Sequence, residues 1–427
     1  MSFPRYPAYK DSGVEWLGEV PEHWEVKRIA SLYREVVEQG SDELPVLSVS
    51  IHHGVSDSEL SEEEMDRKVT RSEDRSKYKR VSAGDLVYNM MRAWQGAFGT
   101  VCVEGMVSPA YVVARPTSIV PSTWIEYLLR TDPAINEIKR FSRGITDFRL
   151  RLYWDEFKNL RVCLPPCNER DALLEFLDRE TAKIDALIAE QQRLIELLQE
   201  KRQAVISHAV TKGLNPDAPM KDSGVEWLGV MPEHWEVGPL KRFLGSLNYK
   251  RVPLSSEERS GRQGDYPYYG ASGVIDSVDA YLFDESLVLV SEDGANLLMR
   301  STPISFEAHG RYWVNNHAHI LMPSDGRTLF WSERIEALQI TPFVTGSAQP
   351  KLTAEALLNL SISCPANLFE KEAIEERIKT ARQEFGPLIN ASENAVALLK
   401  ERRAALISAA VTGQIDVRGL VPEAEAA

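Results

Sequence analysis

The residues of this sequence that could do chemistry are basic side chains that cluster with glycine, amide and aromatic residues. Basic residues outnumber acidic ones in three clusters, which lie within residues 67–80, 139–161 and 241–262. Lysine and arginine contact phosphates, and arginine and amide side chains also pair with base edges. The clusters therefore favour nucleic-acid binding, although each cluster taken alone fits a solvated charged face equally well.

Individual side chains can be selected as candidates for DNA contact. Arg92 and Gln95 lie in a glycine-flanked polar stretch, where arginine can pair with guanine and glutamine with adenine. Arg149 and Arg151 alternate, as two side chains on one face of a strand would. The predicted DNA-binding residues are Arg92, Gln95, Arg143, Arg149 and Arg151 in the N-terminal half, and Tyr268, Tyr269, Ser272, Asn296, Asn316, Gln349 and Lys351 in the C-terminal half. For each of them an ordinary surface or turn position is the alternative.

Motifs of the enzymes that act on DNA are missing from the sequence. Neither Asn-Pro-Pro-Tyr nor Asp-Pro-Pro-Tyr occurs, and no Gly-x4-Gly-Lys-Ser/Thr is present to hold ATP phosphates. Asp132 and Glu137 imitate a nuclease carboxylate set only faintly, and we expect both in a surface helix turn. His317 and His319 have no carboxylate or cysteine near them in sequence. We therefore expect no catalytic residue, no metal and no cofactor in this chain.

Two long helices are the elements that must position these residues. Residues 168–211 contain no glycine or proline, and Leu177, Ile184, Gln191 and Leu198 recur every seven residues, which predicts a coiled coil. Gln191 is either a polar layer that fixes the register or a residue facing solvent. The end of this helix returns near the C-terminus, within a second helix that contains Gly386-Pro387. Because an interior proline costs ~3 kcal/mol, we expect a kink or a break there.

A second repeat shows that the chain is one unit used twice. The segment Lys10–Val26, the first leading motif, returns almost unchanged as the second leading motif, Lys221–Val237. Two copies of a unit usually pack about an approximate two-fold axis. The globular segment that follows each motif has strand-like runs punctuated by glycine and proline, so we expect α+β domains with small sheets. The two globular segments show no obvious identity to each other.

The expected architecture is α+β, with two globular domains separated by two long helices and related by an internal pseudo-two-fold repeat. The predicted boundaries are residues 1–166 for the first leading motif and globular domain, 167–213 for the first helix, 214–366 for the second motif and domain, 367–413 for the second helix, and 414–427 for a flexible tail.

Composition is that of an ordinary globular protein, with 43% hydrophobic residues in a chain of 427. No apolar run approaches the ~18 residues of a membrane helix, and the N-terminus lacks a secretory apolar core. Four cysteines at irregular spacing indicate a reduced compartment, so we expect a cytoplasmic protein. The net charge of −14 argues against nucleic acid at face value, but the basic clusters are local.

In their order along the chain these features resemble the specificity subunits of type I restriction-modification enzymes. The matching segments are the two leading motifs, residues 84–88, 105–111, 165–170, 315–320 and 346–352, and the similar ends of both helices. The resemblance covers nearly the whole chain. The first helix begins with Asn168-Glu-Arg, where the family often has Glu-Gln.

The resemblance implies DNA recognition without catalysis. Two target-recognition domains would each read one half of a bipartite, asymmetric site in double-stranded DNA. The helices would pack as an antiparallel coiled coil that sets the unread gap, although sequence does not distinguish this from parallel packing. Implied partners are two N6-adenine methyltransferase subunits, which bind S-adenosylmethionine, and restriction subunits that translocate DNA with ATP and Mg.

Two other classes of function remain as alternatives. A self-contained nuclease or methyltransferase would be active as the purified chain, and the missing motifs oppose it. A non-catalytic coiled-coil scaffold that binds only protein would not explain why the globular segments diverged while their frame stayed duplicated.

Overall fold

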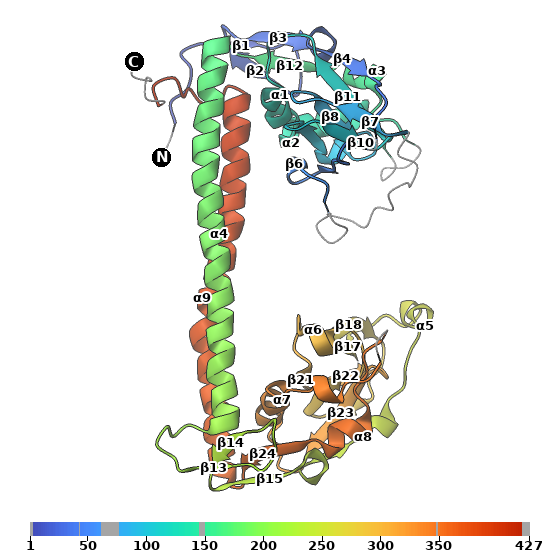
Figure 1. The fold of residues 1–427 in the computed structure, drawn as a ribbon, viewed down its shortest axis with the longest axis vertical. Helices are drawn as coiled ribbons and strands as arrows, with labels where there is room; N and C mark the ends of the chain where they lie inside the picture. The colour runs from blue at the N-terminus through green and yellow to red at the C-terminus, as the bar shows by residue number, and fades with distance from the viewer. Residues whose placement is uncertain (1–2, 42, 61–76, 145–149, 347–348, 421–427) are drawn as a thin grey trace. The chain divides into compact units, whose positions relative to one another are not determined.

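The computed structural model describes residues 3–41, 43–60, 77–144, 150–346 and 349–420. The chain divides into two compact units, which we treat one at a time (Figure 1). Unit 1 comprises Met1–Gln191 and Asn394–Ala427, and unit 2 comprises Gln192–Glu393. Two long helices, α4 (Cys167–Lys212) and α9 (Leu368–Val411), each contribute residues to both units. Among the described helices, none combines the length and apolar character that a membrane span requires.

Unit 1 is built on a four-stranded antiparallel sheet in the order β4-β11-β8-β9. Its strands are β4 (Tyr33–Val36), β8 (Leu86–Asn89), β9 (Phe98–Thr100) and β11 (Tyr111–Pro116). The other described elements are β1 (Tyr9–Asp11), β2 (Glu19–Pro21), β3 (Glu25–Arg28), β5 (Val49–Ser50), β6 (Gly54–Val55), β7 (Lys79–Val81), β10 (Gly105–Val107), β12 (Arg161–Leu164), α1 (Ser122–Leu129), α2 (Asp132–Phe141), α3 (Trp154–Phe157) and short 3-10 turns at Ile29–Ser31 and Ala93–Gln95. Strand β8 is buried at every position, as expected of a short apolar run covered on both faces.

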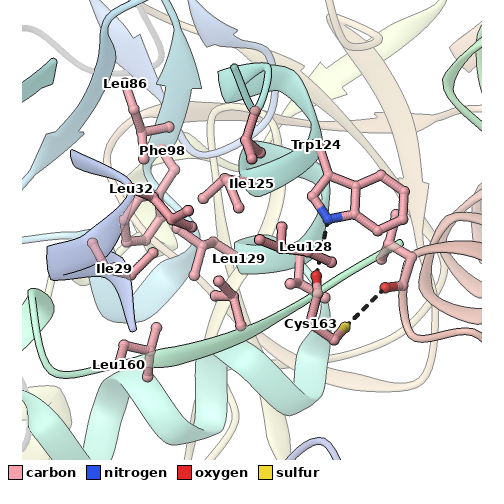
Figure 2. Close-up of a cluster of buried hydrophobic side chains, with 14 of the residues drawn as sticks. Ile29, Leu32, Leu86, Phe98, Trp124, Ile125, Leu128, Leu129, Leu160 and Cys163 are labelled. Atoms are coloured by element: carbon pink, nitrogen blue, oxygen red, sulfur yellow. Dashed lines mark hydrogen bonds between the residues drawn. The ribbon is translucent and has the colours of Figure 1, made fainter. Parts of the chain in front are cut away.

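Helix α1 closes the core of unit 1 against this sheet (Figure 2). Trp124, Ile125 and Leu128 of α1 are fully buried. Trp124 Nε1 donates to the carbonyl oxygen of Cys163 in β12 at 3.1 Å, and Cys163 Sγ donates to the carbonyl oxygen of Val411 at 3.4 Å. Burial raises the pKa of the Cys163 thiol to about 12, so this thiol stays protonated. Strand β12 thereby joins α1 to the end of α9.

Unit 2 contains a sheet in the order β16-β23-β20-β21 and a second sheet in the order β18-β17-β22-β19. The first sheet consists of β16 (Leu244–Ser246), β20 (Leu287–Ser291), β21 (Ser305–Ala308) and β23 (Ala318–Pro323), and the second of β17 (Tyr266–Gly270), β18 (Gly273–Val278), β19 (Phe283–Asp284) and β22 (Arg311–Val314). The other elements are β13 (Met220–Asp222), β14 (Val230–Pro232), β15 (Trp235–Pro239), β24 (Ser361–Pro365), α5 (Ser256–Ser260), α6 (Asn296–Met299), α7 (Thr328–Glu336), α8 (Ala354–Asn359) and 3-10 turns at Leu240–Arg242, Asn248–Lys250 and Thr341–Phe343.

The main sheets of the two units share one strand order although the globular segments show no obvious sequence identity. The order β4-β11-β8-β9 in unit 1 corresponds to β16-β23-β20-β21 in unit 2. The strand registers also correspond, because Asn89 pairs with Tyr111 and Ser291 pairs with Ala318 at the same end of each sheet. A helix follows the sheet in both units, α1 in the first and α7 in the second.

The long helices are antiparallel, which each unit shows by itself. In unit 1, Leu177 near the start of α4 shares a core with Leu406 near the end of α9. In unit 2, Val210 near the end of α4 shares a core with Ile374 near the start of α9. The predicted α+β class with an antiparallel helix pair is therefore confirmed. Because half of each helix belongs to each unit, the division of the chain at residues 166, 213, 366 and 413 stays a prediction.

Helix α9 runs through Pro387 without interruption. The break that was one of the two expected outcomes at Gly386-Pro387 therefore does not occur. Proline removes one helix hydrogen bond, but buried residues anchor α9 on both sides of it. Ala381 before the proline is fully buried, and Ile389 after it is 5% exposed. Packing on both sides of Pro387 keeps the helix continuous.

Each leading motif ends in a His-Trp pair that binds a glutamate in the first turn of a long helix. Trp24 Nε1 donates to Glu169 at 2.8 Å, and His23 Nε2 lies 2.7 Å from the other oxygen of the same carboxylate. Tyr6 Oη also donates to Glu169, at 2.7 Å. The equivalent histidine and tryptophan of the second motif contact Glu370 at 2.8 and 2.9 Å. The repeated motif thus fixes the start of each long helix to its own unit.

Candidate nucleic-acid interface

Three segments of unit 1 converge where β8 ends and β11 begins, and we call them together the unit 1 edge. They are the β8–β9 connection at residues 90–97, the turn at residues 108–110, and the bridged pair of residues 143 and 151. Met90 N donates to the carbonyl oxygen of Ala110 at 3.4 Å, and Leu152 N donates to that of Met90 at 2.8 Å. Arg143 and Arg151 exchange two backbone hydrogen bonds, at 2.9 and 2.8 Å. The polar residues of all three segments are therefore held together.

Local hydrogen bonds fix the shape of the β8–β9 connection. Asn89 Oδ1 accepts from Met91 N, and Trp94 Nε1 donates to the carbonyl oxygen of Met91, both at 3.0 Å. Gly96 ends the 3-10 turn with a φ of 89°, and a Cβ on it would lie 3.3 Å from Ile135 Cδ1. Conformation and space both favour glycine at this position.

The unit 1 edge is positively charged. Arg143, Arg151 and Gln95 are exposed, and Arg92 is half-buried. Arg143 lies 2.6 Å from a carboxylate oxygen of Glu156. In the part of the chain that the structure describes, the guanidinium groups of Arg92 and Arg151 form neither an ion pair nor a hydrogen bond. Both groups are therefore available to an anion.

Unit 2 has an equivalent arrangement, which we call the unit 2 edge. It comprises the turn at residues 271–272, the β20–β21 connection at residues 292–304, the turn at residues 315–317, and the bridged segment formed by residues 345–346 and 349–351. Glu292 N donates to the carbonyl oxygen of His317 at 2.9 Å, and Leu352 N donates to that of Glu292 at 2.8 Å. Thr345 and Lys351 exchange two bonds, at 2.9 and 2.7 Å. Each of these contacts has its counterpart in unit 1.

Acidic side chains compensate the cations of the unit 2 edge. Glu292 lies 2.6 Å from Arg251 Nη1 and 3.1 Å from Lys351 Nζ, and Asp293 lies 2.8 Å from His317 Nδ1. Burial by itself would raise the pKa of Glu292, but the hydrogen bonds from Arg251 and Lys351 and nearby positive charge lower it. The Glu292 carboxylate is therefore ionised at neutral pH, and the unit 2 edge is less cationic than the unit 1 edge.

His319 is a buried, neutral side chain whose hydrogen bonds connect strands and turns of the unit 2 edge. It is 1% exposed; its Nε2 lies 2.8 Å from the carbonyl oxygen of Leu352, and its Nδ1 lies 3.0 Å from Asn248 Nδ2. Asn248 Oδ1 accepts from Ile320 N, which fixes the amide so that its nitrogen donates to His319 Nδ1. The ring proton is therefore on Nε2. Burial lowers the pKa of His319, and the nearby Glu292 opposes this shift without overcoming it.

Most predicted residues of the C-terminal half lie at the unit 2 edge. Ser272, Asn316, Gln349 and Lys351 are exposed there. Asn296 lies there too, but its amide bonds twice at 2.9 Å to the backbone of its own loop. Asn296 therefore shapes the loop.

The two predicted tyrosines are used differently. Tyr268 is 1% exposed, its hydroxyl accepts from Leu254 N at 2.9 Å, and Arg259 covers its ring. Tyr268 is therefore a core residue with no surface to offer DNA. Tyr269 is half-buried, and its carbonyl oxygen accepts from the backbone of the 315–317 turn. The predicted Arg149 lies outside the described residues.

Sequence reasoning missed the role of Arg251 and Glu292 and the equivalence of the two edges. A weak sequence pattern does indicate that the two edges are equivalent. Residues 151–160 and 351–360 both read basic-Leu at the start and Asn-Leu at the end, and their burial is the same at every position. This stretch leads from the bridged pair of each edge into β12 or β24.

The described residues contain no group of three or more histidine, cysteine or acidic side chains that could hold a metal. Glu137 pairs with Arg140 on α2 at 2.8 Å, in the helix that Asp132 begins. His317 is exposed on a turn, whereas His319 is buried in β23, so these two histidines do not form one site. The geometry can bind an anionic, hydrogen-bonding ligand at each edge.

Comparison with known proteins gives these edges a context. Residues 232–386 match the family described as the type I restriction modification DNA specificity domain. A protein of Haemophilus influenzae assigned as a type I restriction enzyme specificity subunit is 29% identical over 157 residues, covering 36% of this chain and 37% of that protein. The EcoDI specificity subunit of Escherichia coli is 21% identical over 189 residues, covering 44% and 40%. The matched stretches thus span well under two thirds of either relative.

The fold is similar over a much longer stretch. A chain from a solved structure of a type I restriction-modification system superposes with a TM-score of 0.58, at 17% identity, over 92% of this chain and 98% of that one. Two units with corresponding main sheets and an antiparallel helix pair define a duplicated, two-domain class of fold. The type I restriction modification DNA specificity domain thus matches residues 232–386 of this chain, and the chain as a whole is similar in fold to a chain of a type I restriction-modification system.

Proposed function

We propose that the unit 1 edge and the unit 2 edge each contact one half of a bipartite, asymmetric site in double-stranded DNA. The observation that carries the proposal is that the two edges share a backbone arrangement but differ in side chains and charge. Equivalent platforms with different surfaces suit two different half-sites. The residues proposed to contact DNA are Arg92, Gln95, Arg143, Arg149 and Arg151 from unit 1, and Ser272, Asn316, Gln349 and Lys351 from unit 2.

The chain performs no chemistry in this proposal. It directs two N6-adenine methyltransferase subunits, which bind S-adenosylmethionine, and restriction subunits that use ATP and Mg, all acting on DNA in the cytoplasm. Exposed leucines on the long helices, such as Leu187, Leu194 and Leu398, offer apolar surface to those subunits. The family match and the fold support this assignment of roles.

Mapping of adenine methylation in the genome tests the proposal. Cells that carry this gene and its companion methyltransferase gene are compared with cells in which only this gene is deleted. We expect deletion to abolish one split motif, methylated on opposite strands in its two halves.

Survival of every methylated motif, while the companion subunit is expressed and active, would contradict the proposal. A scaffold that binds only protein would then be the better description.

A further inference from the structure

The β20–β21 connection presents an apolar tip within the polar unit 2 edge. Met299 is 74% exposed and Leu298 is 48% exposed, whereas the preceding Leu297 is fully buried. The buried leucine anchors the one-turn helix α6, and the two exposed residues lie at its end. The apolar pair at this position is therefore exposed at the unit 2 edge.

Hydrogen bonds hold the backbone next to this tip in place. Arg300, which follows it, has a φ of 52° and is the single non-glycine residue with positive φ in the described chain. Its guanidinium donates to the backbone and side chain of Glu336, at 3.0 and 3.1 Å, and to the carbonyl oxygen of Leu338, at 2.6 Å. The Glu336 carboxylate accepts in turn from Ile304 N at 2.8 Å. Such an unfavourable backbone conformation persists only where the surroundings enforce it.

The rest of the β20–β21 connection is also fixed by hydrogen bonds, and it is joined to the polar residues of the unit 2 edge. Asn296 Oδ1 accepts from Thr302 N at 2.9 Å, which closes the loop on itself. Gly294 N donates to the carbonyl oxygen of Pro350 at 2.9 Å, which joins the loop to the segment that carries Gln349 and Lys351. An apolar side chain carried by a fixed backbone loses less entropy on binding than one carried by a mobile loop.

Unit 1 presents a methionine from the corresponding connection. Met91 is 44% exposed, and its backbone is fixed because its N–H donates to Asn89 Oδ1 and its carbonyl oxygen accepts from Trp94 Nε1. Its neighbours at the unit 1 edge are the cations Arg92 and Arg151. Both edges therefore combine an exposed methionine with groups that suit phosphates and base edges.

We propose that Met299, supported by Leu298, enters the base stack of the half-site bound by unit 2 and unstacks one base step, and that Met91 does the same in unit 1. The inference rests on the proposed function and adds the mode of contact. Apolar wedges of methionine or leucine unstack base steps and kink the duplex in other DNA-binding proteins. At the unit 1 edge the cations Arg92 and Arg151 beside Met91 complement a polyanion, and the equivalent place of Met299 in the unit 2 edge assigns it the same occupant, DNA.

The test uses the full chain in complex with its companion methyltransferase subunits. Duplexes carry the target site, as identified by the methylation map, with 2-aminopurine or pyrrolocytosine placed at successive positions of the unit 2 half-site. We expect a several-fold rise in fluorescence at one base step on binding. Met299→Ala should abolish the rise and weaken binding about tenfold, since buried methionine surface is lost while the cost of unstacking is spared.

Two variants serve as controls. Met299→Leu keeps an apolar wedge and should keep the fluorescence rise. Met322→Ala removes another exposed methionine of unit 2, which is 43% exposed on β23, and should change neither fluorescence nor affinity.

Specific binding without a fluorescence rise at any step, or a rise that persists in Met299→Ala, would overturn the wedge and leave the proposed function intact. A Met299→Ala chain that loses its methyltransferase subunits but keeps the fluorescence rise would also overturn it, because Met299 would then contact protein. Failure of the wild-type complex to bind the duplex would instead refute the proposed function.

Discussion

At the scale of single residues, cations in equivalent places have different electrostatic surroundings. The guanidinium of Arg151 has no acidic partner among the described residues, whereas Lys351 is 3.1 Å from Glu292. A cation that neutralises one phosphate contributes about 0.9 to the slope of log K against log salt. Arg151→Ala should therefore lower that slope by about 1, and Lys351→Ala by clearly less, because Glu292 already neutralises the lysine.

Affinities for the target duplex, measured by fluorescence anisotropy at several salt concentrations, give both slopes. Arg140→Ala is the control, since two carboxylates, those of Glu15 and Glu137, already pair with Arg140. Equal reductions for Arg151→Ala and Lys351→Ala would show that Glu292 does not compensate Lys351.

His319 links the stability of unit 2 to pH. Burial lowers its pKa in the folded chain below the ordinary value of 6.5. As the pH falls below about 6.5, His319 therefore takes up a proton in the unfolded chain but not in the folded chain. The stability of the folded chain therefore falls as the pH falls through that value towards the folded pKa. The charged groups nearest the ring are Glu292, Arg251 and Lys351.

Thermal unfolding of the full chain between about pH 7.5 and about pH 5.5 measures this linkage. His319→Gln keeps a donor and an acceptor but does not titrate, so its melting temperature should fall less over the range than that of the wild type. Parallel profiles for the two proteins would mean that another group carries the pH dependence.

At the scale of elements, the two leading motifs make equivalent contacts with the start of a long helix, so the two contacts can be compared directly. Glu169 accepts from Tyr6 and Trp24 and contacts His23, and its side chain is 5% exposed. Glu370 has the equivalent histidine and tryptophan as partners, and its side chain is 23% exposed. Removing a buried acceptor leaves its donors unsatisfied, which costs about 1–3 kcal/mol for each group.

We therefore expect Glu169→Ala to destabilise the chain by about 2–4 kcal/mol. Glu370→Ala should destabilise it by less, because Glu370 has fewer donors and they are more exposed to water. Chemical denaturation of each variant, followed by tryptophan fluorescence, measures the difference. Each variant is the other's control, and a larger loss for Glu370→Ala would contradict the burial argument.

Elements with local causes were predictable from the sequence, and contacts between distant segments were not. The seven-residue spacing of Leu177, Ile184 and Leu198 predicted a long helix because helix geometry repeats locally. The pairing of Trp24 with Glu169 joins residues far apart in sequence, so no local pattern announces it. The antiparallel direction was a consequence of the family resemblance and needed the shared cores to be established.

The candidate site shows the same limit. The Gly-flanked polar stretch that holds Arg92 and Gln95 is a connection between strands, as its residue types indicate, and its contact with DNA stays a prediction. A run of aromatics around Tyr268 looked similar but fills a small core of unit 2. Burial depends on what packs above a residue, and composition alone does not supply that information.

At the scale of the whole molecule, the units have separate interiors. Among the described residues, no hydrophobic cluster draws side chains from both units. The edges are likewise built from the strands of their own sheets. A substitution at one edge therefore alters side-chain contacts within the core of its own unit.

It follows that changes in recognition should be confined to one half of the methylated motif. Arg92→Ala with Gln95→Ala should relax the half read by unit 1, since each lost bidentate base contact removes about 1–3 kcal/mol of discrimination. Asn316→Ala with Gln349→Ala should relax the other half and spare the first. Methylation maps of cells that express each double variant read both halves at once, so the unaltered half is an internal control. Relaxation of both halves by one double variant would mean that the units read DNA jointly, and the separation of their cores would then have no counterpart in recognition.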